Sequence, residues 1–135
     1  MPEVAIFNPA SLSRPLGQYS QIARVRAREF VFIAGQVAVD IAGNIVGADD
    51  FDAQCTQVFA NIKAGLDSVG AGWGDVVQFT SYLVDAQDVA KFMEYRARSF
   101  PGMFPPGAYP PNTLLIVDRL VQELLRLEVQ TVAAL

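Results

Sequence analysis

The chain has 135 residues, of which 52% are hydrophobic, with a net charge of −4, a pI near 4.6, no histidine and one cysteine. This length suits one domain spanning residues 1–135, and the high apolar content predicts that part of the surface is buried in a subunit interface. The acidic balance argues against a nucleic-acid partner, and without histidine or a cysteine pair we expect neither a metal site nor a disulfide. No window holds about 18 consecutive apolar residues and the N-terminus has no signal-peptide pattern, so we expect a cytoplasmic protein without a membrane partner.

The N-terminal third of the chain predicts strands joined by turns. Ser20 to Val25 alternates apolar and polar residues, as a half-buried strand does. The continuous apolar run Phe30–Ile33 predicts a strand that is buried on both faces. Ala42-Gly43-Asn44 predicts a turn between the extended segments Val37–Asp40 and Ile45–Val46.

A long amphipathic helix follows, over Phe51–Val69, with Asp49 or Asp50 as its N-cap. Its apolar residues recur at intervals of three and four, and Cys55 lies on this stripe, so we interpret Cys55 as a core residue. The glycines after Val69 end the helix, and Val76–Val84 is rich in the β-branched and aromatic residues that favour a strand.

The C-terminal part predicts a second helix and two more strands. Asp85 or Asp88 caps the helix, which extends to Phe100 and ends at Pro101-Gly102. The proline-rich segment Phe104–Pro111 predicts a stiff loop, which we interpret as the wall of a cleft. Two strands follow, Thr113–Val117 and Leu124–Val132. The order of elements predicts a mixed sheet with both helices on one face and an open face that an oligomer would cover.

The basic residues are scattered, apart from Arg24, Arg26 and Arg28, which lie two apart on a predicted strand and therefore share one face. We interpret this face as solvated or as lining an interface; a groove for a polyanion is the alternative. We interpret four charged residues in the second helix and in the last connection as surface charges: Arg96, Arg98, Arg119 and Glu123. For Arg96, a position at a subunit boundary is the alternative.

Four short motifs occur in the order and spacing of one known family: Gly17-Gln18-Tyr19-Ser20-Gln21, Gly35-Gln36, Asn61-Ile62-Lys63-Ala64 and Leu127-Glu128-Val129. On these motifs the chain resembles the RidA family, also called YjgF/YER057c/UK114, over nearly its whole length. The resemblance implies a chorismate-mutase-like α+β fold and a homotrimer with clefts between neighbouring subunits. It also implies deamination of 2-imino or enamine acids without a cofactor.

The resemblance assigns roles to particular residues. In the family an arginine pairs bidentately with the substrate carboxylate, a tyrosine shapes the pocket and a glycine N–H assists. This sequence keeps the last two as Tyr19 and Gly35, but the serine usual before the glycine is Ala34 and the arginine position is Asn112. Asparagine cannot reproduce the bidentate charged contact of arginine.

The family's last strand carries a glutamate that orders the attacking water, in a glutamate–apolar–glutamate pattern that reads Arg126-Leu127-Glu128 here. The water-ordering position therefore corresponds to Arg126, unless the alignment slips by a residue or two between Leu120 and Leu125. On one strand, Arg126 and Glu128 would lie about 6–7 Å apart and pair. Alternatively, Arg126 enters the cleft as a replacement anion site, with Glu128 as the candidate proton relay.

Each remaining candidate also has a purely structural interpretation. The hydroxyl of Tyr19 can bond a backbone carbonyl, Gly35 can permit close approach of two chains, and Asn112 can cap its own loop. Our leading hypothesis is a small-molecule cleft protein, an imine or enamine deaminase or hydrolase with a non-standard substrate and weak or no activity on simple 2-imino acids. The alternatives are a non-catalytic metabolite-binding module and, less favoured by an acidic chain without histidine, an endoribonuclease.

Overall fold

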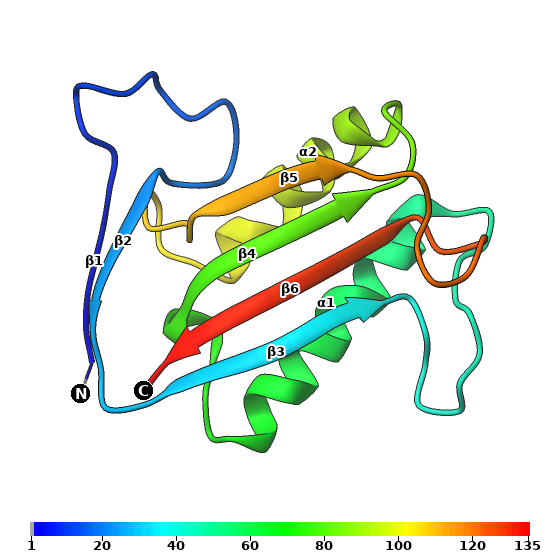
Figure 1. Cartoon of the computed structure of the whole chain (residues 1–135), viewed down its shortest axis with the longest axis horizontal. Helices are drawn as coiled ribbons and strands as arrows, with labels where there is room; N and C mark the ends of the chain where they lie inside the picture. The colour runs from blue at the N-terminus through cyan, green and yellow to red at the C-terminus, as the bar shows by residue number, and fades with distance from the viewer. Residues whose placement is uncertain (1) are drawn as a thin grey trace.

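The computed structural model describes residues 2–135 and contains two β-sheets (Figure 1). β1 (Glu3–Phe7) and β2 (Ile22–Arg26) form an antiparallel hairpin beside the main sheet. In the main sheet β6 runs antiparallel to both its neighbours, whereas β4 and β5 run parallel. The strands of the main sheet follow the order β3 (Phe30–Val37), β6 (Leu127–Ala134), β4 (Val76–Leu83), β5 (Asn112–Ile116).

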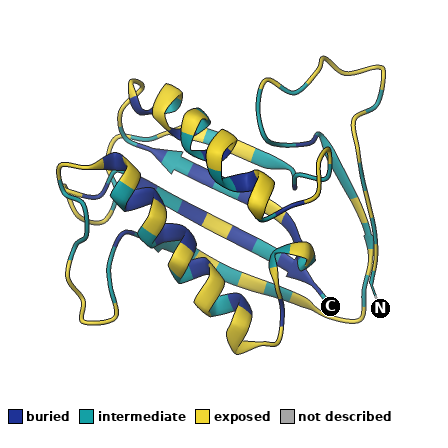
Figure 2. Ribbon diagram, turned by 180° about the vertical axis from the view of Figure 1, so that it is seen from behind, coloured by how far each residue is buried: buried dark blue, intermediate teal, exposed yellow. Residues whose placement is uncertain are grey.

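Both long helices, α1 (Phe51–Ser68) and α2 (Asp88–Ser99), cover the same face of the main sheet, and the other face is open (Figures 1 and 2). This confirms the predicted α+β fold with a mixed sheet. Residues of β6 alternate accordingly, because Leu127 and Val129 are buried against the helices while Glu128 between them faces the open side. None of the helices in residues 2–135 combines the length and the apolar character that crossing a membrane requires.

The prediction that Phe30–Ile33 is buried on both faces was wrong. Val31 and Ile33 pack against the core, whereas Phe30 and Phe32 are 47% and 74% exposed on the open face. The helices supply cover on one side only, so a continuous apolar run places half of its side chains in solvent within a single chain. The predicted turn is confirmed in part, since Val39 and Ile45 form an isolated antiparallel bridge.

Helix α1 begins where the sequence predicts it. The side chain of Asp50, rather than that of Asp49, accepts a hydrogen bond from the Ala53 N–H at 3.1 Å and thereby caps the first turn. Gly70 follows the last turn with φ of +71°, a left-handed conformation that glycine adopts without steric cost. Cys55 is fully buried on the stripe that faces the sheet, as predicted.

Helix α2 begins at Asp88, and neither predicted aspartate caps it. Asp85 Oδ1 accepts a hydrogen bond from the Gln87 N–H at 2.9 Å in the preceding turn, and Gln87 occupies the cap position without a side-chain bond. The α-helix ends at Ser99, one residue before the predicted Phe100, and the chain continues as a 3₁₀ turn, η2 (Phe100–Gly102), so Pro101-Gly102 ends the helix as predicted.

Strand β6 begins at Leu127, three residues later than the predicted Leu124. The cause is the fully buried side chain of Gln54 on α1, which holds the preceding segment outside the sheet. Its Nε2 donates to the carbonyls of Gly47 and Leu124, at 3.1 and 2.8 Å, and its Oε1 accepts from the Arg126 N–H at 2.8 Å.

An aromatic cluster fixes α2 against the rest of the core. The ring of Phe59 on α1 lies 6.0 Å from that of Phe79 on β4, 6.4 Å from that of Phe92 on α2 and 5.6 Å from that of Phe100. Such pairs add about 0.5–1.5 kcal/mol each beyond the burial of their area. The side of α2 that carries Phe92 is therefore held over β4 and β5, where the candidate site lies.

Candidate functional site

Gly35 and Glu128 meet on the open face of the sheet. A Cβ atom placed on Gly35 would overlap Glu128 Oε2, so the glutamate side chain rests directly against this backbone. The pairing of β3 with β6 is irregular between Ile33 and Gln36, which marks a β-bulge at this point. The carboxylate of Glu128 and the bulged backbone at Gly35 therefore lie next to each other, and both are half-exposed.

Tyr19 is held beside Asn112 by the end of the proline-rich loop. Ser20 forms a parallel bridge with Pro111, and its N–H donates to the Pro110 carbonyl at 3.4 Å. The Tyr19 hydroxyl accepts a hydrogen bond from the Leu16 N–H at 3.3 Å. This differs from the expected bond to a carbonyl, and it leaves the hydroxyl proton free to donate.

Asn112 is the first residue of β5, not part of a loop. Its Oδ1 accepts a hydrogen bond from the Ser81 Oγ at 2.7 Å, so it does not cap its own backbone. The amide nitrogen finds no acceptor among the described residues and is available as a donor.

These two residues line a pocket of about 320 Å³ between α2 and β5. No acidic side chain lines it. Its polar residues are Tyr19, Asn112 and Arg96, and its apolar lining is Leu16, Val89, Met93 and Leu114, with Gly17 between.

Arg96 is the residue that the sequence interpretation missed, because it was assigned to the surface. It is only 3% exposed, and its Nε and Nη1 atoms are buried without a hydrogen-bond partner among the described residues. The guanidinium carbon lies 4.4 Å from the centre of the Phe92 ring. Burial lowers the pKa of Arg96 to about 10, against an opposing effect of Tyr19, so the side chain keeps its charge at neutral pH. A signal was present: residue 96 occupies an apolar position of α2, four residues after Phe92 and four before Phe100.

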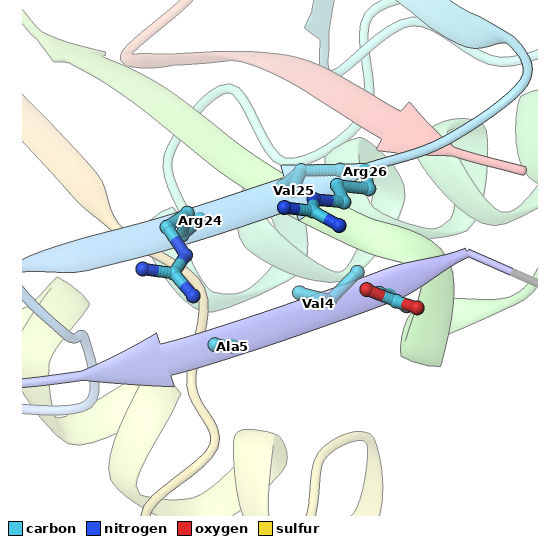
Figure 3. A pocket seen from close by; sticks show the side chains of 6 residues that line it. Val4, Ala5, Arg24, Val25 and Arg26 are labelled. Atoms are coloured by element: carbon cyan, nitrogen blue, oxygen red, sulfur yellow. The ribbon is translucent and has the colours of Figure 1, made fainter.

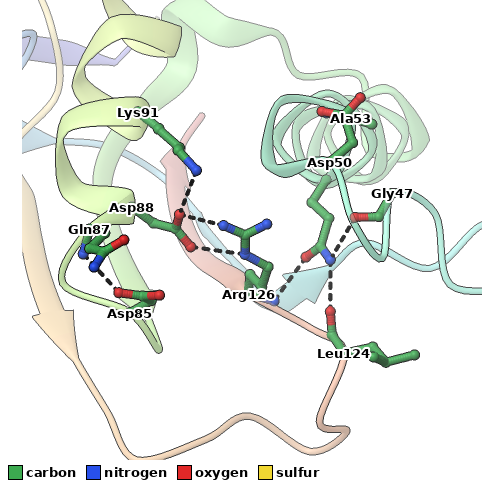
Figure 4. Close-up of polar contacts among 10 residues, drawn as sticks. Gly47, Asp50, Ala53, Asp85, Gln87, Asp88, Lys91, Leu124 and Arg126 are labelled. Carbon is green, nitrogen blue, oxygen red and sulfur yellow. Dashed lines mark hydrogen bonds and ion pairs between the residues drawn. The ribbon is translucent and has the colours of Figure 1, made fainter.

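Arg126 occupies a different environment from the expected one. It precedes β6, so it does not share a strand face with Glu128, and its guanidinium donates from Nε and Nη2 to the two carboxylate oxygens of Asp88 (Figure 4). Asp88 is 1% exposed, and Lys91 Nζ lies 3.7 Å from it. The two guanidinium nitrogens Nε and Nη2 of Arg126 thus bind a buried carboxylate at the start of α2.

The two groups of candidate residues face opposite sides of the sheet. Glu128 pairs with Tyr82 on the open side, whereas Asn112 bonds Ser81, a buried residue on the helix side. Within one chain the structure therefore brings Gly35 to Glu128 and Tyr19 to Asn112, but it does not join these pairs.

The arginines of β2 line a separate shallow hollow on the hairpin. Arg24 and Arg26 project from the same strand, over a floor that includes Val4 and Ala5 of β1 (Figure 3). Glu3 lies opposite Arg26 in the strand pairing and also lines the hollow. An acidic residue therefore interrupts the basic stripe, and this agrees with a solvated face rather than a polyanion groove.

Known proteins are similar to this chain over most of its length. It is 35% identical to the RutC family protein PH0854 of Pyrococcus horikoshii, over 89% of each chain. Among solved structures, YyfB of the Rid family from Yersinia pestis superposes with a TM-score of 0.85 at 27% identity, over 98% of each chain. Escherichia coli TdcF with bound serine superposes with a TM-score of 0.71 at 26% identity, over 97% of this chain and 98% of TdcF.

The mixed sheet and its two helices define a protein of the RidA-like α+β class. The family described as endoribonuclease L-PSP matches residues 11–135. The chain belongs to this family, the RidA/YjgF family, as the resemblance predicted.

Proposed function

We propose that this protein is a cofactor-free imine or enamine hydrolase whose substrate differs from the simple 2-imino acids. The observation that carries the proposal is the Glu128 carboxylate resting on Gly35 at a bulge of the open sheet face. A carboxylate beside a bulged backbone can hold a water molecule and exchange protons with it. Bulges of this kind are common next to active sites.

This contact also supports Glu128 as the residue that corresponds to the family's water-ordering glutamate. The resemblance puts that glutamate on the last strand, and Glu128 lies on β6 against Gly35, whereas Arg126 precedes the strand. The guanidinium of Arg126 forms an ion pair with the carboxylate of Asp88. Both observations favour the alternative in which the alignment slips by two residues, with Glu128 as the proton relay.

The chemistry requires few groups. Water adds to the imine carbon while Glu128 takes a proton from that water and passes it to the nitrogen, which gives a carbinolamine. Glu128 then takes the proton of the carbinolamine hydroxyl and transfers it to the nitrogen as the C–N bond breaks. The products are a carbonyl compound and ammonia, which balances one imine and one water. An enamine first gains a proton at carbon and then follows the same course.

The complete cleft, in this proposal, forms between neighbouring copies of a homotrimer. Glu128 and the pocket of Tyr19 and Asn112 face opposite sides of one sheet, so a single small ligand meets both only when two copies supply them. Phe30 and Phe32 on the open face supply apolar surface for such an assembly. Serine bound to TdcF supports a ligand of amino-acid size.

The preference for other substrates rests on Asn112. At the position where the family places an arginine, an amide offers no bidentate charged contact to a carboxylate next to the imine carbon. We therefore expect weak turnover of 2-aminoacrylate and stronger turnover of larger imines.

The test is ammonia release from imines generated in situ by an amino acid oxidase or, for 2-aminoacrylate, by a dehydratase, each compared with a buffer blank. Glu128→Gln should lower the rate about 100-fold or more, as expected for loss of an acid–base group. Glu123→Gln is the matched control, because Glu123 is exposed and pairs with Arg119. Equal rates in wild type and Glu128→Gln would contradict the proposal.

A non-catalytic metabolite-binding module is the second candidate. One observation favours it: the pocket of Tyr19, Asn112 and Arg96 holds donors and no carboxylate that could act as a base. Ligands that raise the melting temperature, combined with no ammonia release above the blank from any imine, would establish this second function.

A further inference from the structure

We propose that the pocket between α2 and β5 is a binding site for a small carboxylate with a short apolar chain, and that Arg96 is its anion-binding residue. Anion binding can be measured without turnover, so the inference goes beyond the proposed hydrolase activity.

The first argument is the unpaired charge of Arg96. A buried guanidinium without an anionic partner is costly, because burial removes its hydration and nothing replaces it. Nε and Nη1 of Arg96 lack any hydrogen-bond acceptor among the described residues, and the contact that remains is the face of the Phe92 ring. A carboxylate in the pocket would supply both the missing charge and the missing acceptors.

The second argument is the position of Arg96 in α2. Residue 96 follows Val89, Phe92 and Met93 on the helix side that packs inward, where a leucine or methionine would pack without an electrostatic cost. Its charged neighbour Arg98 points outward and pairs with Asp52. The arginine at 96 therefore interrupts the apolar stripe of α2 at the pocket.

The third argument is the composition of the pocket. Besides Arg96, its donors are the Tyr19 hydroxyl, whose proton is unused, and the free amide nitrogen of Asn112. No carboxylate of the described chain competes for these donors. The volume of about 320 Å³ lies at the small end of ligand sites and suits a short aliphatic acid against the apolar lining.

In this proposal the anion-binding arginine of this protein lies on helix α2, at position 96, whereas the family has its arginine at the position of Asn112 on strand β5. A guanidinium that reaches the pocket from α2 places the carboxylate differently from one at position 112. This explains a changed substrate rather than the loss of anion recognition. That last step rests on the proposed function; the binding site itself does not.

The experiment is calorimetric titration of the full-length protein with sodium butyrate and with butyramide, its neutral counterpart of similar shape, at equal ionic strength. We expect butyrate to bind at least tenfold more tightly than butyramide. Arg96→Met should abolish that preference and raise the thermal midpoint of the ligand-free protein, because it removes an unpaired buried charge. Arg98→Met is the control and should bind butyrate as the wild type does.

Wild-type protein that binds butyrate and butyramide equally, or not at all, would overturn the proposal even if no variant could be purified. So would butyrate binding that survives Arg96→Met. A lowered thermal midpoint in Arg96→Met would also overturn it, since the guanidinium would then be satisfied within the assembled protein. Charge-selective binding without ammonia release would support this site while the hydrolase proposal fails.

Discussion

The carboxylate of Glu128 rests against the backbone of Gly35, where the addition of one methyl group would displace it. The side chain of Glu128 is thus positioned by the absence of a side chain on the neighbouring strand. Both residues lie on the sheet face that the helices leave open.

Gly35→Ala should therefore lower activity with little effect on folding. The new Cβ would overlap Oε2, Cδ and Cγ of Glu128, so this flexible side chain must rotate away as a whole and the cost falls on the position of the carboxylate. We expect ammonia release to fall about tenfold or more, approaching the loss in Glu128→Gln. Gly74→Ala is the control, because nothing lies within 4 Å of a Cβ at that position. Full activity in Gly35→Ala would show that the carboxylate need not occupy this spot.

Arg126→Ala should destabilise the protein strongly. It leaves the carboxylate of Asp88, which is 1% exposed, without its bidentate partner. Breaking one side of a buried ion pair typically costs about 3–5 kcal/mol in the free energy of unfolding. Urea unfolding at a fixed protein concentration measures the loss.

Two further variants define what the Arg126 result means. Arg98→Ala removes an exposed partner of Asp52 and should cost less than about 1 kcal/mol. The double variant Asp88→Leu with Arg126→Met should recover most of the stability, because two apolar side chains leave no charge unpaired. If the double variant were as unstable as Arg126→Ala, the pair would contribute through more than its charges.

Cys55 should make the protein less stable in alkali. Burial raises the pKa of its thiol, and the carboxylates of Asp52 and Asp88 raise it further. The unfolded chain releases the proton near its ordinary pKa of about 8.5, while the folded chain retains it. Stability is therefore complete below that pH and falls as pH rises above it.

Urea midpoints between pH 7 and 10 test this dependence, and Cys55→Ala should show a smaller alkaline decline than the wild type. Iodoacetamide should label Cys55 at a rate that follows global unfolding. Rapid labelling of the folded protein at pH 9 would contradict the buried, protonated thiol.

Phe32→Glu should prevent assembly if the open face forms the subunit interface. Phe32 is 74% exposed and projects from the centre of β3, so a charge there would be desolvated at an interface. Sedimentation velocity should show a trimer for the wild type and a monomer for this variant. Ile41→Glu, in the exposed turn after β3, should leave the trimer intact.

Local patterns predicted much of the fold. The capping aspartate and the apolar stripe located α1 almost to the residue, because both depend on interactions within the helix. The start of β6 was misplaced because it depends on Gln54, which is distant in sequence and bonds the segment before the strand. The burial of Phe30 and Phe32 was misjudged because an apolar run does not reveal how many sides of a sheet are covered.

The site was harder to predict for the same reason. Tyr19, Gly35 and Glu128 are candidates from the resemblance to a family, and the structure adds that Glu128 lies against Gly35. Arg96 was assigned to the surface, with a subunit boundary as the alternative, although its position on the apolar stripe of α2 indicated the interior. The partner of Arg126 followed from the packing of α2 against the segment before β6, which sequence spacing does not specify.

The three hydrogen bonds of Gln54 have a consequence for how this molecule tolerates change. They attach the segment before β6 to α1, so the register of that strand does not depend on the length of the preceding connection, residues 117–123. The exposed part of that connection, residues 121–123, can gain or lose residues while Glu128 stays in place. It is accordingly the natural place to insert a fluorophore or an affinity tag, and a stretch where homologous chains of different length would be difficult to align.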